Sequence, residues 1–138
     1  MRALVQRVSS ASVSVDGRVV AAIGPGLLVL LGIARDDDAP AVERLVHKLR
    51  ALRVFDDADG RMNEALGERE ILCVSQFTLY GELRRGNRPS FAAAAPAEQA
   101  EPLYERFCEL ASAKRGIFGA RMAVELVNDG PVTLLLET

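Results

Sequence analysis

Five consecutive aliphatic residues, Leu27–Leu31, are the feature that most restricts how this chain folds. Glycines flank the run, which has the length of an ordinary strand and is short for a helix. A strand with one face in water alternates polar and apolar residues, whereas a strand covered on both faces is apolar throughout. The sequence therefore predicts a central strand with other parts of the protein packed against both of its faces.

Further strand-like segments lie before and after this run. The predicted strands are residues 2–8, 11–15, 18–23, 70–79, 122–127 and 131–137. Asp16-Gly17 is a strong signal for a tight hairpin turn. Residues 56–63 are polar and predict a loop, and residues 128–131 predict the turn that joins the last two strands.

Two segments have the apolar spacing of amphipathic helices. Apolar residues recur at i, i+3, i+4 and i+7 over residues 40–52, and a second such segment follows Pro96. Asp36–Asp38 precede Pro40, which is typical of a helix start because carboxylates favour the positive end of the helix dipole. His47 falls outside the apolar stripe of the first helix, and we expect it to face solvent.

Length and charge limit the class of protein. The 138 residues correspond to about one ordinary domain. The order of elements predicts a single α/β domain over residues 1–138, with a mixed sheet and helices packed on one side. A net charge of −2 gives no overall field to draw the chain onto nucleic acid, so any RNA contact must be local.

Hydrophobic patterning predicts a cytoplasmic protein. No apolar run is long enough to span a membrane, since Arg35–Asp38 ends the longest one. The first ten residues do not resemble a signal peptide, because Arg2, Gln6 and Arg7 interrupt what would be its apolar core. The two cysteines, Cys73 and Cys108, lie in apolar or amphipathic stretches and are predicted to be reduced residues of the core.

Few residues are available for metal chemistry. A single histidine, His47, excludes sites built on several histidines. Asp36–Asp38 are better explained as a helix start, and the acidic residues near Gly60 lack the spacing of an EF-hand. We expect neither a metal nor a cofactor.

Two segments do not have the composition of ordinary structural elements. Ser75-Gln76-Phe77-Thr78 ends a buried run, and strand alternation would place Gln76 and Thr78 on one face and Ser75 and Phe77 on the other. Core strands usually avoid so many polar groups, although neighbouring backbone could satisfy these hydroxyls. The second segment is Asn128-Asp129-Gly130-Pro131, which by its spacing alone is an ordinary turn.

Taken together, these segments resemble the D-aminoacyl-tRNA deacylase family. The similarity covers essentially the whole chain and depends on several motifs in the right order. These are Gln6-Arg7-Val8, Ser75–Leu79, Arg88-Pro89-Ser90-Phe91, Gly116–Met122 and Asn128–Thr133. The resemblance implies a mixed sheet with barrel-like layers, and a homodimer whose active site lies at the subunit interface. It also implies an enzyme that hydrolyses the ester between a D-amino acid, or glycine, and the terminal adenosine of tRNA.

The resemblance also implies roles for particular residues. Ser75, Gln76, Phe77 and Thr78 would line the active site. Gly130 and Pro131 would be joined by a cis bond and enter the site from the partner subunit. Their carbonyl groups would crowd the α-carbon of the amino acid, so that an L side chain clashes while hydrogen fits. Arg7 would hold these carbonyls, and Phe118 would contact the terminal adenine.

The residues themselves leave the hydrolytic step open. Ester hydrolysis needs an activated nucleophile and donors for the developing oxyanion, and no side chain is an evident general base. Thr78 could act as a nucleophile only if another group removed its proton. The interpretation we favour places the oxyanion at backbone N–H groups of Gln76–Thr78, with the 2′-hydroxyl of the terminal ribose helping to activate water.

Charge adds one more expected contact. Arg84, Arg85 and Arg88 lie close to the Ser75–Thr78 motif and suit contact with tRNA phosphates, although a solvated loop would look the same in sequence. We expect no DNA and no membrane as partners. Two other functions stay open: a hydrolase of small D-amino-acid esters or amides that uses Thr78, and an RNA-binding protein without catalysis.

Overall fold

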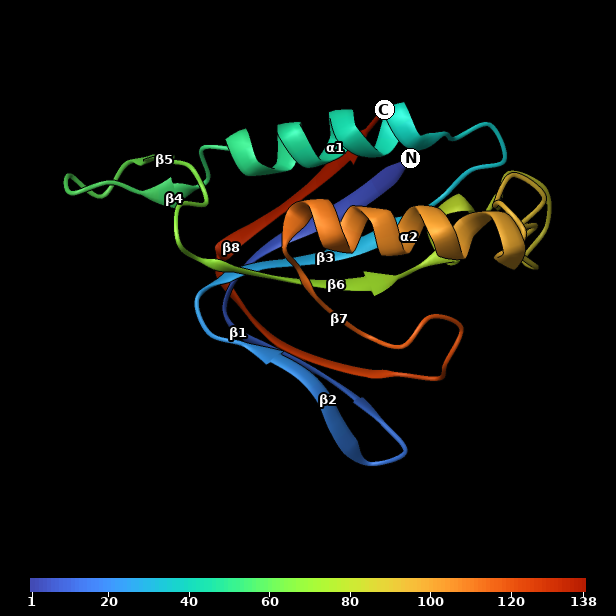
Figure 1. Cartoon of the computed structure of the whole chain (residues 1–138), viewed down its shortest axis with the longest axis horizontal. Coiled ribbons are helices and arrows are strands. Elements are labelled where there is room, and N and C mark those ends of the chain that lie inside the picture. Colours follow the sequence, from blue (N-terminus) through green and yellow to red (C-terminus); the bar gives the residue numbers. More distant parts are fainter.

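The computed structural model describes all residues 1–138 as a curved sheet with two long helices on one side (Figure 1). In chain order the strands are β1 (Arg2–Val15), β2 (Arg18–Ile23), β3 (Gly26–Gly32), β4 (Phe55–Asp56), β5 (Met62–Glu64), β6 (Glu70–Ser75), β7 (Lys114–Arg115) and β8 (Ala123–Glu137). The helices are α1 (Ala39–Ala51), the short 3₁₀ helix η1 (Phe77–Tyr80) and α2 (Ala97–Ala111). The predicted α/β fold with a mixed sheet is therefore confirmed.

Strand β1 is the spine of the sheet. One of its edges pairs with β3 and then with β2, and its other edge pairs with β8 along nearly its whole length. On the far side of β3, strands β6 and β7 follow in parallel. The two ends of this sheet approach each other, since the Lys114 Nζ on β7 donates to the carbonyl of Ala22 on β2 at 2.9 Å. The result is a nearly closed barrel.

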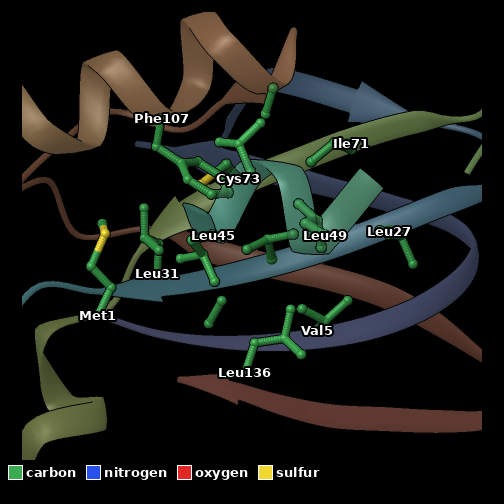
Figure 2. Close-up of a cluster of buried hydrophobic side chains, with 14 of the residues drawn as sticks. Met1, Val5, Leu27, Leu31, Leu45, Leu49, Ile71, Cys73, Phe107 and Leu136 are labelled. Atoms are coloured by element: carbon green, nitrogen blue, oxygen red, sulfur yellow. The ribbon is translucent and has the colours of Figure 1, made fainter. Parts of the chain in front are cut away.

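Strand β3 is buried on both faces, as its composition predicts. Leu27, Val29 and Leu31 belong to the larger core, which lies between the sheet and the two helices (Figure 2). Leu28 points the other way into a smaller core inside the curled sheet. Gly26 lets β6 come close, because a side chain there would place its Cβ only 2.0 Å from the carbonyl oxygen of Glu70.

Both predicted helices are present within a few residues of their expected bounds. Asp38 caps α1, and its carboxylate accepts from the N–H of Ala41 at 2.9 Å. The two helices pack against each other and cover one face of the sheet. His47 is exposed on α1, as expected. The Asp16-Gly17 hairpin is also confirmed, since both residues have the positive φ that a type I′ turn requires.

Three sequence expectations were wrong in their detail. Residues 56–63 are not simply a loop, because β4 and β5 form a small hairpin there. The strand predicted over 70–79 ends at Ser75 and continues as η1. Residues 128–131 are not a hairpin turn, because the chain on both sides of them runs along β1 in the same direction as one strand, β8. The two-residue strand β7 was not predicted.

Candidate active site

The Ser75–Thr78 segment lies where the chain leaves the sheet. The N–H of Gln76 donates to the carbonyl of Leu31 at 2.8 Å, after which the backbone turns into η1. The alternation of faces expected for a strand is therefore wrong beyond Ser75. Gly32 allows η1 to lie this close to β3, since a Cβ at Gly32 would be 3.1 Å from both the Gln76 carbonyl oxygen and the Leu79 Cβ.

A mostly apolar cavity of about 220 Å³ opens beside this turn. It brings together four of the residues expected in the site: Ser75, Gln76, Phe77 and Phe118. The remaining walls are Leu31, Ile33, Ala95, Ala97, Ala100 and Gly119. The cavity therefore combines an apolar lining with the polar groups of one turn, as small-molecule sites usually do.

Phe118 is held in place by a buried aromatic neighbour. Its ring centroid lies 5.6 Å from that of Tyr104, with an angle of 49° between the rings. Tyr104 is fully buried on α2, and its hydroxyl donates to the carbonyl of Cys73 at 3.0 Å. One wall of the cavity is therefore an aromatic ring in a fixed orientation.

Two backbone donors in the turn have no partner in the protein. The N–H groups of Phe77 and Thr78 begin η1, so they have no acceptor within that helix. The backbone hydrogen bonds outside the regular elements use the N–H groups of Gln76 and Leu79 but not these two. Adjacent unpaired N–H groups are the usual means of stabilising an oxyanion in acyl transfer.

Thr78 lies next to the cavity but is not part of its lining. Its Oγ1 is hydrogen-bonded to the side-chain amide of Gln76. An amide is not a base at neutral pH, so this contact orients the hydroxyl without preparing it to lose its proton. No other side chain is hydrogen-bonded to Thr78.

The second group of predicted site residues gathers around Arg7 on β1. Its side chain is 8% exposed, and its Nε donates to the carbonyl of Asp129 at 3.0 Å. Its Nη1 donates to the carbonyl of Val54 at 2.8 Å and to the carboxylate of Asp56 at 3.1 Å. Arg7 therefore ties the Asp129–Val132 segment to the β4 region.

The Gly130-Pro131 peptide bond, which is cis, lies within this bulged segment of β8. Asn128 pairs with Val8 of β1 and Thr133 with Gln6, so four residues of β8 stand opposite Arg7 alone. The bulge is closed by the side chain of Asn128, whose Nδ2 donates to the carbonyl of Val132 at 3.1 Å. Contacts at both ends therefore fix the shape of the bulge.

Within one chain the bulge is far from the cavity. Arg7 pairs with Leu27 near the start of β3, whereas Ser75 pairs with Leu31 near its end. Four residues of strand correspond to about 13 Å. The structure therefore does not bring Gly130 and Pro131 to the cavity of their own chain.

The arginines form a separate hollow next to the cavity. Arg84, Arg85, Arg88, Glu82 and Ser90 line it. Phe91, the next residue, packs edge to face on Phe77 with 5.0 Å between the ring centroids. Since Phe77 also lines the cavity, the arginine-bearing loop is attached to the rim of the candidate site.

No group of three or more His, Cys, Asp or Glu side chains is arranged to hold a metal ion. None of the helices has the length and apolar character needed to cross a membrane.

Both cysteines are buried and free, and burial raises the pKa of the Cys73 thiol well above its usual value. The prediction of unpaired core cysteines is confirmed.

Comparison with known proteins identifies the family. The D-Tyr-tRNA(Tyr) deacylase family model matches residues 4–137. A D-aminoacyl-tRNA deacylase of Anaeromyxobacter dehalogenans is 57% identical over 145 residues, which cover all of this chain and 97% of the relative. The corresponding enzyme of Symbiobacterium thermophilum is 54% identical, again over all of this chain and 96% of the relative.

Two solved structures share the fold of this chain. The structure titled c-Myc DNA Unwinding Element Binding Protein superimposes with a TM-score of 0.94 at 46% identity, over all of this chain and 99% of the other. A probable eukaryotic D-amino acid tRNA deacylase shares the fold at 20% identity, with a TM-score of 0.83 over 98% of this chain and 97% of the other.

The fold and these matches define the class of protein as a deacylase-type hydrolase. The chain belongs to the D-aminoacyl-tRNA deacylase family. The resemblance seen in the sequence motifs is thereby confirmed, together with the nearly closed barrel and two helices of this fold.

Several residues of the cavity could not have been found from sequence. Ile33 lies just past β3, Ala95 lies just before α2, and Ala97 and Ala100 lie at the start of α2. Small and aliphatic side chains carry no chemical signal, and only the packing of α2 beside the end of β6 brings them to the cavity.

Proposed function

We propose that this protein hydrolyses the ester of D-aminoacyl-tRNA, and of mischarged glycyl-tRNA, in the cytoplasm. The oxygen of a water molecule attacks the ester carbonyl carbon, the bond to the ribose 3′-oxygen breaks, and that oxygen takes a proton. The products are the free amino acid and tRNA. The observation that carries the proposal is a turn with two unpaired N–H groups at the mouth of an apolar cavity, in a chain of this family.

The cavity holds the terminal adenosine in this proposal. Its lining suits the face of a purine ring, with Phe118 as the aromatic contact. Ser75 and Gln76 supply the polar groups at its edge. The ester carbonyl then lies over the start of η1, where the N–H groups of Phe77 and Thr78 receive the developing oxyanion.

The proton balance of the reaction involves the substrate itself. His47 is exposed on α1, outside the cavity, and the amide beside Thr78 is not a base. The 2′-hydroxyl of the terminal ribose is adjacent to the ester and orients the attacking water. The enzyme contributes position and the oxyanion donors, with neither metal nor cofactor.

Selection against L-amino acids uses a second copy of the chain. Strand β8 pairs only with β1, so its other edge is free, and it exposes Leu126, Val127, Leu134 and Leu135. A long apolar edge strand is a surface that another chain can cover. In the homodimer the Gly130-Pro131 bulge of one subunit reaches the cavity of the other, where its carbonyls crowd the α-carbon and leave room for hydrogen alone.

The first experiment compares release of amino acid from D-tyrosyl-tRNA and L-tyrosyl-tRNA, with and without a chelator. Selective release from the D substrate, unchanged by the chelator, supports the proposal. Release from neither substrate, together with binding of uncharged tRNA, favours an RNA-binding protein instead. Release from a D-tyrosyl ester that lacks the ribose 2′-hydroxyl, at an undiminished rate, contradicts the role given to that hydroxyl.

Gly130→Ala tests the chiral part separately. Gly130 has φ +125°, and its Cβ would lie 2.9 Å from both the Arg7 Nη2 and the Val132 Cγ2. The substitution therefore displaces the bulge, and we expect loss of activity or of the preference for D over L. Gly60→Ala is the control, since it also has a positive φ but no atom within 4 Å. Equal effects of the two variants would contradict the proposal.

A further inference from the structure

The loop from Glu82 to Ser90, here called the arginine loop, is a closed structure next to the cavity. Glu82 and Ser90 exchange two backbone hydrogen bonds of 2.8 and 3.0 Å, which join the two ends of the loop. Within it, Arg84, Arg85, Arg88, Glu82 and Ser90 line a hollow of about 530 Å³. Three guanidinium groups and one carboxylate therefore face a common space.

The three arginines are not equivalent. The carboxylate of Glu82 accepts from the Nε, the Nη2 and the backbone N–H of Arg84, each at 2.7 Å. Arg84 is therefore paired with Glu82, although its side chain is 87% exposed. Arg85 and Arg88 are exposed and make no hydrogen bond or ion pair through their side chains. The hollow thus carries two guanidinium groups whose donors are all available.

The position of the loop relates these two charges to the cavity. Phe91 follows Ser90 directly and packs on Phe77, which lines the cavity. On the other side of the loop, Gly81 is so close to the Thr78 carbonyl oxygen that a Cβ there would be 3.0 Å from it. The loop is therefore attached to η1 at both ends. An RNA strand that leaves the cavity past Phe77 would then meet the hollow.

We propose that Arg85 and Arg88 bind backbone phosphates at the 3′ end of the tRNA, beside the nucleotide held in the cavity. The inference rests on the proposed function. Guanidinium groups bind phosphate with two parallel hydrogen bonds, and such contacts supply affinity regardless of base sequence. The site explains how a chain with a net charge of −2 binds a polyanion, since the positive charge is local.

Glu82 has a defined part in this arrangement. Its carboxylate holds Arg84 and contributes the one negative charge of the hollow. Glu82→Gln removes that charge and releases Arg84, while the backbone pairing with Ser90 remains. This variant should bind RNA more tightly than the wild type, which is the opposite of the effect expected from a merely destabilised loop.

The first test measures binding of uncharged tRNA as a function of salt. For the double variant Arg85→Ala/Arg88→Ala we expect the affinity for tRNA to fall about tenfold or more. We also expect the slope of log K against log salt to become shallower by about 1.4, because each phosphate contact on a single strand contributes about 0.7. Arg44→Ala/Arg61→Ala is the control double variant. Both side chains lie outside the arginine loop, are exposed and make no ion pair. Equal losses in the two double variants would overturn the proposal.

The second test separates this inference from the proposed function. D-tyrosyl-adenosine carries the ester and the base but no phosphate, whereas D-tyrosyl-tRNA carries both. We expect the Arg85→Ala/Arg88→Ala variant to raise KM for the tRNA substrate about tenfold and to leave hydrolysis of D-tyrosyl-adenosine unchanged. Equal impairment on both substrates would overturn the phosphate role. If the wild type hydrolyses neither substrate, the proposed function fails, and the binding test still decides the inference.

Discussion

Arg7 on β1 and Asp129 on β8 are joined by a hydrogen bond of 3.0 Å from the Arg7 Nε to the Asp129 carbonyl. The same guanidinium group donates to the Val54 carbonyl, so one buried side chain links the bulge of β8 to the segment after α1. The position of the Gly130-Pro131 bond therefore depends in part on the geometry of Arg7.

Replacement of Arg7 should affect both stability and chiral selection. Arg7→Ala leaves the buried Val54 carbonyl and the partly buried Asp129 carbonyl without this donor and removes a buried charge, so we expect a loss of about 3 kcal/mol in the free energy of unfolding. Arg7→Lys keeps the charge but not the forked geometry, so it should lower selection for D over L with a smaller loss of stability. Denaturant unfolding and hydrolysis of the two tyrosyl-tRNAs measure these effects.

Arg106→Ala is the control for the stability of these variants. Arg106 of α2 pairs with Glu43 of α1, but its side chain is 44% exposed. Exposed ion pairs contribute little, so the expected loss in the free energy of unfolding is below about 1 kcal/mol. If Arg106→Ala and Arg7→Ala were equally destabilised, the buried contacts of Arg7 would not be the source of the effect.

Periodicity predicted the fold better than it predicted the connections. The apolar run of β3 and the stripes of α1 and α2 have physical causes within their own sequence, since each requires a particular face to be buried. The short strand β7 and the β4-β5 hairpin have no such pattern. They exist because neighbouring backbone supplies hydrogen-bond partners, which the sequence of the segment itself does not show.

The site was predicted as residue types and not as geometry. The motif Ser75–Thr78 was singled out, but its strand conformation was wrong because the Gln76 N–H finds the Leu31 carbonyl and the chain then turns. The sequence of residues 128–131 predicts a turn, because Asp-Gly-Pro is typical of turns. Only the pairing of β8 with β1 on both sides shows that it is a bulge within a strand.

Thr78→Val distinguishes the two roles left open for this residue. If Thr78 only borders the site, the variant loses one hydrogen bond to the Gln76 amide, and kcat should fall by about tenfold or less. A nucleophilic Thr78 would instead require a loss of several orders of magnitude. Single-turnover hydrolysis of D-tyrosyl-tRNA measures this. Detection of an ester between the amino acid and the protein would contradict our prediction.

The two cysteines should be unreactive in the folded protein. Cys73 and Cys108 are 0% and 1% exposed, so neither sulfur is accessible to a reagent in the folded protein, and burial also raises the pKa of the Cys73 thiol. We expect no labelling by a thiol reagent in native buffer and labelling of both residues in denaturant. Rapid labelling of native protein at either residue would show that the contact between α2 and β6 opens.

The two tyrosines should make the protein less stable at alkaline pH. Burial raises the pKa of Tyr80 to about 12, and burial also raises the pKa of Tyr104. In the unfolded chain both phenols lose their protons near pH 10. Above that pH the unfolded state binds fewer protons than the folded state, so the free energy of unfolding falls as pH rises. For a phenol such as Tyr104 the expected slope is about 1.4 kcal/mol per pH unit.

Tyr104→Phe isolates the part due to that residue. At neutral pH it should cost about 1 kcal/mol, because the Cys73 carbonyl loses the hydroxyl but keeps the Gly116 N–H as a donor at 3.1 Å. Above pH 10 the free energy of unfolding should fall less steeply with pH for the variant than for the wild type. The two plots of this free energy against pH should therefore converge. Denaturant unfolding at a series of alkaline pH values measures both slopes, and parallel curves would mean that the Tyr104 hydroxyl ionises as readily in the folded protein as in the unfolded chain.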